Sequence, residues 1–469
     1  MTTIFQFECR RWVKSKAVWI VFLAWCGICA FAIRDRGHSI RSVQAANNTN
    51  RIYEDSLEKQ YYLNLDSVEK GLKQVPNWRT DPRNPVIFNL RVPRFAFFQA
   101  GPLNPLVTGQ SDVLPGKFVA SRRFDYRVER QNASNGLQTF YGKLDMAFAI
   151  VFLLPLLIVA FNFNILSSEK EKNTLKLLLA QQASIQEIIF GKLAVSFLFT
   201  LVMLVVPIVF AGIGFGSGVW LYLAIGCLYS LFWHLLCGYV NSRLRSSAWN
   251  ATVLLTGWML IVLILPATIT TVTGMIHPVP SRTKFITEYR RILNEADKDS
   301  TSLVLNKYFY DHPEMVKQDT AGNLRNRANE FYKASHINQD KTQRALRPLH
   351  ESNNRAILSA NQFADNAGLI SPAAIMHQSL VLLAGQSTRQ YLYFHQQIDE
   401  WRKPYLGFVL DKLVQDGAVT RIETERFKGF HYTPYDFSRQ LVINCQALLL
   451  FNVLLGVLLF RSCKRVIVV

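Results

Sequence analysis

The chain has 469 residues, of which half are hydrophobic and only 18% are charged. So small a charged share argues against an ordinary soluble protein over most of this length, because about a quarter of the residues of a typical soluble domain are charged. The formal net charge is +19. The basic residues bracket apolar runs and form no recognition helix or finger, so they indicate contact with anionic lipid, and no nucleic-acid partner is expected.

Six apolar runs are long enough, or nearly so, to cross a bilayer as helices, which takes about 20 residues each. In chain order, spans one to six are Ala17–Ile33, Leu144–Leu166, Ile188–Ile213, Val219–Val240, Ala248–Val272 and Leu441–Phe460. We therefore predict an all-α integral membrane protein with six transmembrane helices.

The long polar segments between spans divide the chain further. The predicted parts are 1–33, an interfacial helix and span one; 34–143, a first extracytoplasmic region; 144–274, spans two to five with a cytoplasmic coupling helix at 167–187; 275–438, a second extracytoplasmic region; and 439–469, span six and a cytoplasmic tail. Both insertions are expected to be mainly helical. Val75–Gly116, dense in proline and glycine, is expected to be loop and turn.

Short basic segments predict the orientation, because Lys and Arg in short loops are retained in the cytoplasm. The N-terminal flank and residues 167–176, 241–247 and 461–465 are basic or lysine-rich, and they alternate correctly with six spans. Both termini are therefore predicted to be cytoplasmic.

Prolines lie inside spans two, three and five, at Pro155, Pro207 and Pro266. Each lacks a backbone N–H and frees a carbonyl of its own helix. Lipid cannot donate to that carbonyl, so we expect neighbouring helices to do so.

No enzyme motif is present. Gly116-Lys117 and Gly191-Lys192 lack the rest of a phosphate-binding loop, and neither H-E-x-x-H nor a paired C-x-x-C occurs. We expect no catalytic residue, metal site or cofactor site on this chain.

Polar residues in or beside spans are functional-site hypotheses by default. The candidates are Asp145, Asn162, Asn164 and His234. Each has a structural alternative: a helix cap for Asp145, and hydrogen bonds between helices for the two asparagines and for His234, in place of a proton relay.

The stretch between spans two and three, Ser167–Ala194, reads SSEKEKNTLKLLLAQQASIQEIIFGKLA. Charged residues come first, and Leu175, Leu178 and Leu179 then form one apolar helical face. This pattern predicts a short amphipathic helix lying against the membrane. The alternative is an ordinary loop helix packed on a soluble core.

This stretch resembles the permease subunits of ABC-2-type transporters. The resemblance rests on Ser167, Glu169, Glu171, Thr174, Leu175, Leu177, Leu178 and Leu179, followed by Gly191-Lys192-Leu193. In that family, the stretch follows a span and contacts the ATP-binding subunit. The family usually has glycine before the threonine. Here Asn173 stands in its place, and asparagine tolerates the same left-handed turn.

Four further segments resemble the branch of that family with two large extracytoplasmic regions. They are residues 109–115 (GQSDVLP), 142–145 (GKLD) leading into 153–157 (LLPLL), 280–282 (PSR) and 371–373 (SPA).

The resemblance implies a permease of an ATP-driven exporter or extractor in the bacterial cytoplasmic (inner) membrane. The chain itself is then no enzyme, and ATP and Mg bind to the ATP-binding subunit, present in two copies. Further implied partners are a second permease, a different but related chain, and an extracytoplasmic protein. The coupling residues would be Glu169, Glu171, Thr174, Leu175, Leu178, Leu179, Gly191 and Lys192. The two acids would pair with basic residues, either on the ATPase or on the inner helix ends.

An alternative of another class is a membrane-anchored extracytoplasmic sensor or assembly scaffold without transport. A scaffold has no need of an acidic, leucine-rich coupling helix. An intramembrane enzyme is disfavoured, because no paired polar residues lie at one depth.

Overall fold

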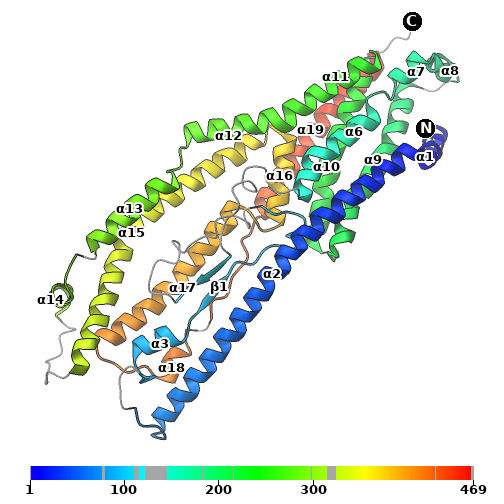
Figure 1. The fold of residues 1–469 in the computed structure, drawn as a ribbon. Helices are drawn as coiled ribbons and strands as arrows, with labels where there is room; N and C mark the ends of the chain where they lie inside the picture. The colour runs from blue at the N-terminus through cyan, green and yellow to red at the C-terminus, as the bar shows by residue number, and fades with distance from the viewer. Residues whose placement is uncertain are drawn as a thin grey trace.

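The computed structural model describes residues 2–75, 80–109, 116–121, 145–181, 184–214, 216–296, 298–313, 324–427 and 429–465. The chain forms an elongated, mostly helical body with both termini at one end, beside the short helices α7 and α8 (Figure 1). We name this end the terminal end. The sequence motifs at 110–115 and 142–144 lie outside the described residues.

Among the residues that the structure describes, six helical segments are long and apolar enough to cross a membrane, and each overlaps one of the predicted spans. They are α2 (Lys16–Glu69); α5 (Met146–Phe148), η2 (Ala149–Leu153), α6 (Leu154–Asn162) and α7 (Ser167–Glu171) in succession; α9 (Ile185–Ala211); α10 (Ser217–Asn241); α11 (Ser247–Trp258), η3 (Met259–Ile264) and α12 (Leu265–Ile276) in succession; and α19 (Ser438–Arg465). The prediction of an all-α membrane protein with six spans is confirmed.

Neighbouring helices donate to carbonyls near the prolines, as predicted. The Met203 carbonyl, four residues before Pro207, accepts the Trp25 indole N–H at 2.9 Å. Likewise, the Val151 carbonyl, four residues before Pro155, accepts the Tyr229 hydroxyl at 2.9 Å. Trp25 lies in α2 and Tyr229 in α10, so these bonds also fasten spans to one another.

Helix α2 continues well beyond the bilayer. Its 54 residues span about 80 Å, whereas a hydrocarbon core is about 30 Å thick. The distal half of α2 therefore forms one edge of a second body, which we name the outer region (Figure 1). The other elements of this region are α3 (Pro85–Arg91), β1 (Phe95–Phe97), β2 (Lys117–Val119), α13 (Arg282–Ala296), α14 (Thr301–Asp311), α15 (Leu324–Gly368), α17 (Thr388–Val414) and α18 (Arg421–Thr424).

The expectation of only loop and turn over Val75–Gly116 is wrong, because α3 and β1 lie within it. Proline does not prevent a helix when it occupies the first turn, where its missing N–H has no intrahelical partner. Pro85 stands there in α3, and the Asn84 side chain accepts the Val86 N–H at 2.9 Å as an N-cap.

Helix α16 (Pro372–Leu383) connects the outer region to the membrane bundle. Its Ile375, Met376 and Leu380 are buried in the same apolar core as the spans. The Asn444 amide of α19 donates to the Ser379 hydroxyl at 2.9 Å. This short helix is therefore part of the bundle core, although it is much shorter than a span.

A buried arginine holds β1 against α2. The Arg94 guanidinium donates to both carboxylate oxygens of Glu58 at 2.6 Å and lies 3.5 Å from Glu54. Although burial alone lowers the pKa of a guanidinium, the neighbouring carboxylates raise the pKa of Arg94 above its usual value. The Phe95 N–H also donates to Glu54, at 3.1 Å.

Candidate functional site

The stretch predicted as one coupling helix forms two short helices, α7 and α8 (Thr174–Ala180). Asn173 separates them and has φ 58° and ψ 13°. This is the left-handed conformation that a glycine would adopt, so the predicted turn is confirmed. The next helix, α9, begins with a capping box formed by Ser184 and Glu187.

Leucines of α8 anchor it to the terminal end of the bundle. Leu175 is buried, and Leu178 and Leu179 are partly buried against it. The same apolar cluster contains Ile165, Leu166, Ile185, Ile188, Ile189, Leu193, Leu459 and Cys463. Leu177, by contrast, is 64% exposed and is the leucine that faces away from the bundle.

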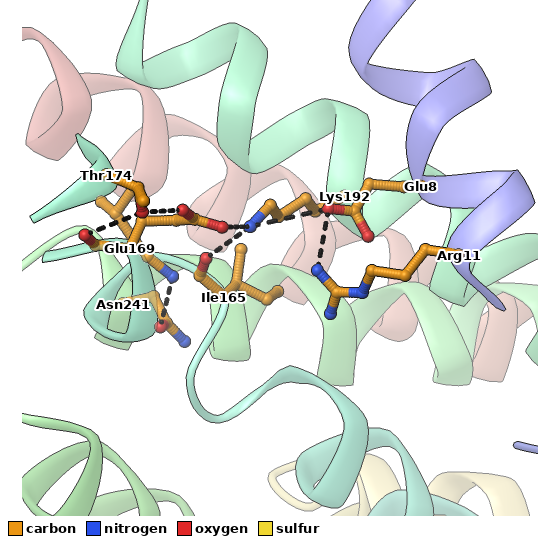
Figure 2. Close-up of polar contacts among 8 residues, drawn as sticks. Glu8, Arg11, Ile165, Glu169, Thr174, Lys192 and Asn241 are labelled. Atoms are coloured by element: carbon orange, nitrogen blue, oxygen red, sulfur yellow. Dashed lines mark hydrogen bonds and ion pairs between the residues drawn. The ribbon is translucent and has the colours of Figure 1, made fainter. Parts of the chain in front are cut away.

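Lys192 is the centre of an ion-pair cluster at this end, shown in Figure 2. Its ammonium lies 2.6 Å from a Glu169 carboxylate oxygen and 3.7 Å from a Glu8 carboxylate oxygen. It also donates to the Ile165 carbonyl at 3.2 Å. We name Glu8, Glu169 and Lys192 the Lys192 cluster. The cluster joins α7 and α9 to the N-terminal helix α1 (Thr2–Lys14).

Helix α1 lies close against α9. A Cβ atom on Gly191 would stand 3.1 Å from Ile4, so glycine permits this approach. The Trp12 ring packs 5.0 Å from Phe161 and 5.3 Å from Phe199, measured between ring centroids.

Glu8 is buried, and Arg11 donates to it at 3.2 Å. Neither residue was predicted as part of the site. The available signal was that Glu8 is the only acidic residue before Asp35.

Glu169 also fixes the turn into α8. The Thr174 hydroxyl donates to the Glu169 carboxylate and lies 3.2 Å from the Glu169 carbonyl oxygen. Figure 2 shows Thr174 and Lys192 on opposite sides of this carboxylate. One side chain therefore connects the turn at Asn173 to the first part of α9.

Glu171 binds the start of span five. Its two carboxylate oxygens accept the Ser247 N–H at 2.7 Å and the Ser247 hydroxyl at 2.8 Å. Ser247 is the first residue of α11, where free N–H groups and the helix dipole favour an anion. Nearby, Lys170 donates to the Leu244 carbonyl at 2.8 Å. Thus α7 is fastened to span five by its charged side chains.

Asn241, at the end of α10, joins three spans. Its side-chain oxygen accepts the Leu166 N–H and the Asn250 amide, each at 3.2 Å. Its amide donates to the carbonyls of Asn162 and Cys237, each at 2.9 Å. Sequence analysis missed this residue, because one asparagine at the end of an apolar run has no distinctive pattern.

The four polar candidates of the spans do not form one site. Asn162 and His234 share the Ser196 hydroxyl, at 2.7 Å and 3.2 Å. Asn164 lies in the turn after α6, where its backbone carbonyl accepts the Ser168 N–H at 3.1 Å. Asp145 lies at the opposite end of span two from Asn162 and caps α5, where it accepts the Phe148 N–H at 2.9 Å.

These arrangements offer hydrogen bonds between helices and helix caps. No group of three His, Cys, Asp or Glu residues suited to a metal ion occurs in the described ranges. The site at the terminal end is therefore structural in kind: ion pairs and hydrogen bonds of charged side chains connect the short helices to the ends of spans.

The fold and this site define a multi-pass membrane protein in which charged side chains connect short helices to spans at one end. Residues 2–274, more than half of the chain, match the family model described as ABC-2 family transporter protein. Residues 282–433 match another, described as Domain of unknown function (DUF3526). No curated protein and no solved structure matches the chain. The chain belongs to the ABC-2 transporter family and is an ABC transporter permease, a transport subunit that partners an ATP-binding subunit.

Proposed function

We propose that this permease couples ATP hydrolysis on a separate subunit to rearrangement of a transmembrane permease dimer. In this role it exports a substrate across the bacterial cytoplasmic membrane or extracts one from it. The terminal end then faces the cytoplasm. ATP and Mg²⁺ bind to the nucleotide-binding subunit, present in two copies, and the second permease is a different but related chain.

The observation that carries this proposal is the set of ion pairs and hydrogen bonds that α7 makes with α9 and α11. The exposed surface of α7 and α8 presents Leu177 with Lys172 and Lys176. Behind that surface, Glu169 binds Lys192 of α9 and Glu171 binds the start of α11. A subunit that moves this surface would move the ends of spans three and five with it. The family match supports the same reading.

The first test is affinity purification of the full-length chain in a mild detergent, followed by mass spectrometry. We expect a protein with a phosphate-binding loop to co-purify. Leu177→Asp should reduce its recovery at least several-fold, because a charge would face the partner's apolar surface. Leu90→Asp is the matched control, since Leu90 is equally exposed but lies in the outer region. Recovery of this chain alone, or with extracytoplasmic partners only, would favour the sensor or scaffold.

The second test concerns coupling. The variant reverses the charge of both acids, with Glu169→Lys and Glu171→Lys. It should leave membrane insertion and ATP hydrolysis intact but abolish the nucleotide-dependent rearrangement of the spans. Hydrogen exchange measures that rearrangement. The control is Glu288→Lys with Glu295→Lys, because these acids pair with Arg291 on the exposed helix α13. A double variant that rearranges like the wild-type complex would refute the coupling role of Glu169 and Glu171.

A further inference from the structure

Span five contains an interrupted stretch of backbone hydrogen bonding. The π-helical turn η3 shifts the pattern, so that the Leu265 N–H donates to the Leu260 carbonyl, five residues back. In this register, the next N–H along the chain would serve the Ile261 carbonyl. That residue is Pro266, which has no N–H. The hydrogen-bond ladder is therefore broken at Pro266, and the Ile261 carbonyl needs another donor. We name such a break at a proline of a span a proline joint.

Ser371 supplies that donor. Its hydroxyl lies 3.0 Å from the Ile261 carbonyl oxygen, and the residue is completely buried. The same hydroxyl accepts the Ala374 N–H at 3.3 Å and so caps α16. One buried group thus closes the joint in span five and starts the helix that connects the outer region to the bundle.

The source of the donor distinguishes this joint from the other two. Trp25 and Tyr229, which donate near Pro207 and Pro155, belong to spanning helices. Ser371 instead follows the long segment of the outer region and lies 110 residues from its acceptor in sequence. Among the three proline joints, all within the described residues, the joint of span five is the one closed by the segment that connects the outer region to the bundle.

We propose that Ser371 is a positioning residue that fastens the outer region to the joint of span five. Glu171 of α7 binds the first residue of span five. Ser371, which caps α16, binds the proline joint of the same span. Movement received at α7 and α8 is then passed through span five to the outer region. This inference rests on the proposed coupling function and adds its route and its residue.

The pairing of Ser371 with Pro266 is tested by a double-mutant cycle on the purified full-length chain, read as the thermal unfolding midpoint. Ser371→Ala should lower Tm by about 2–4 °C. In a Pro266→Ala background, residue 266 regains an N–H for Ile261, so the same change should cost less than half as much. The remaining loss reports the cap of α16. An equal loss in both backgrounds would overturn the pairing.

Two controls keep this test decisive. Ser379→Ala removes another buried hydroxyl of α16, one bonded to α19, and should lower Tm equally in both backgrounds.

Should Pro266→Ala fail to fold, Ser371 variants replace the cycle. Ser371→Thr keeps the donor and should preserve Tm, whereas Ser371→Asp keeps only the capping acceptor and should lower Tm at least as much as Ser371→Ala does, because its carboxylate would be buried beside the Ile261 carbonyl. Equal Tm values for Thr and Asp would overturn the assignment.

The route is tested by hydrogen exchange on the complex with its ATP-binding subunit, with and without ATP, Mg²⁺ and vanadate. In the wild type we expect exchange to change in α7, α8 and α16. Ser371→Ala should keep the change in α7 and α8 but remove at least half of the change in α16. A full response of α16 in this variant, or none in the wild type, would overturn the route. Absence of any response in α7 and α8 would instead refute the proposed function, leaving the unfolding cycle as an independent test of the pairing.

Discussion

The outer region and the terminal end each contain a largely buried cation between two carboxylates, and the two clusters are built differently. In the outer region, Arg94 lies between Glu54 and Glu58. At the terminal end, Lys192 lies between Glu8 and Glu169.

The Arg94 cluster fixes a single arrangement. A guanidinium is planar and matches a carboxylate with two parallel bonds, as it does with Glu58. Both carboxylates come from one turn of α2, so the cluster joins only two elements. An ammonium, by contrast, is a compact charge without a preferred plane. Lys192 has its acceptors on α1, α7 and the turn at Ile165, so it joins elements that can shift relative to one another.

Arg94→Met tests the fixed cluster and should have the largest effect. It would leave the buried Glu54 and the partly buried Glu58 without a cation, at a cost of about 3–5 kcal/mol. Limited proteolysis and denaturant unfolding of the outer region would measure the loss. Arg94→Lys should recover only part of it, because lysine cannot bind Glu58 with two parallel bonds. Full recovery with lysine would remove the distinction between the clusters. Arg347→Met, at an exposed arginine, is the control.

Lys192→Met should cost less, about 2–3 kcal/mol, because Lys192 makes one short ion pair, at 2.6 Å, whereas Arg94 makes two short bonds to Glu58. The two carboxylates would then repel each other, so adding Glu8→Gln should recover part of the loss. The measurement is thermal unfolding of the purified chain together with hydrogen exchange in α1 and α8. If Glu8→Gln made the variant worse, Glu8 would not belong to the cluster. Lys341→Met changes an exposed lysine of the outer region and serves as the control.

Glu171→Gln should have a smaller effect, because this carboxylate is exposed and screened by salt. It removes the charge at the start of α11 but keeps one acceptor. We expect faster hydrogen exchange at residues 247–250 with little change in overall stability. Glu187→Gln, at the start of α9, gives the matched control, which should leave exchange in α11 unchanged. Unaltered exchange at 247–250 in Glu171→Gln would show that α7 does not hold span five.

Substitutions of Asn173 test the left-handed turn between α7 and α8. Asn173→Gly keeps the left-handed turn and should be close to neutral. Asn173→Val places a β-branched side chain at φ 58°, which costs about 1–2 kcal/mol. Thermal unfolding and recovery of the ATP-binding subunit measure both variants. A stable Asn173→Val chain would show that the turn between α7 and α8 relaxes without loss.

The sequence predicted the membrane part of this fold well, because the length and apolarity of a span are local properties. The same holds for the carbonyls near Pro155 and Pro207, which accept hydrogen bonds from other spans, and for the turn at Asn173. In contrast, the density of prolines around Pro85 predicts loop, whereas proline at the first helical turn, as in α3, is typical of a helix start.

For the candidate site, the sequence identified Glu169, Glu171 and Lys192 as a group through their motif, without showing what each would bind. Their partners at Glu8 and Ser247 come from other segments of the chain. Asn241 was missed for the same reason: its contacts with Leu166, Asn162 and Asn250 exist only once three spans are packed together.

By itself, the sequence determined the six spans, the prolines within them and the acidic, leucine-rich stretch between spans two and three. These depend on composition over a few helical turns. The tertiary structure decided which helix closes each proline joint, where Leu177 faces and which cation each carboxylate meets. Such choices depend on distances of a few ångströms between residues far apart in sequence, and local patterns carry no information about those distances.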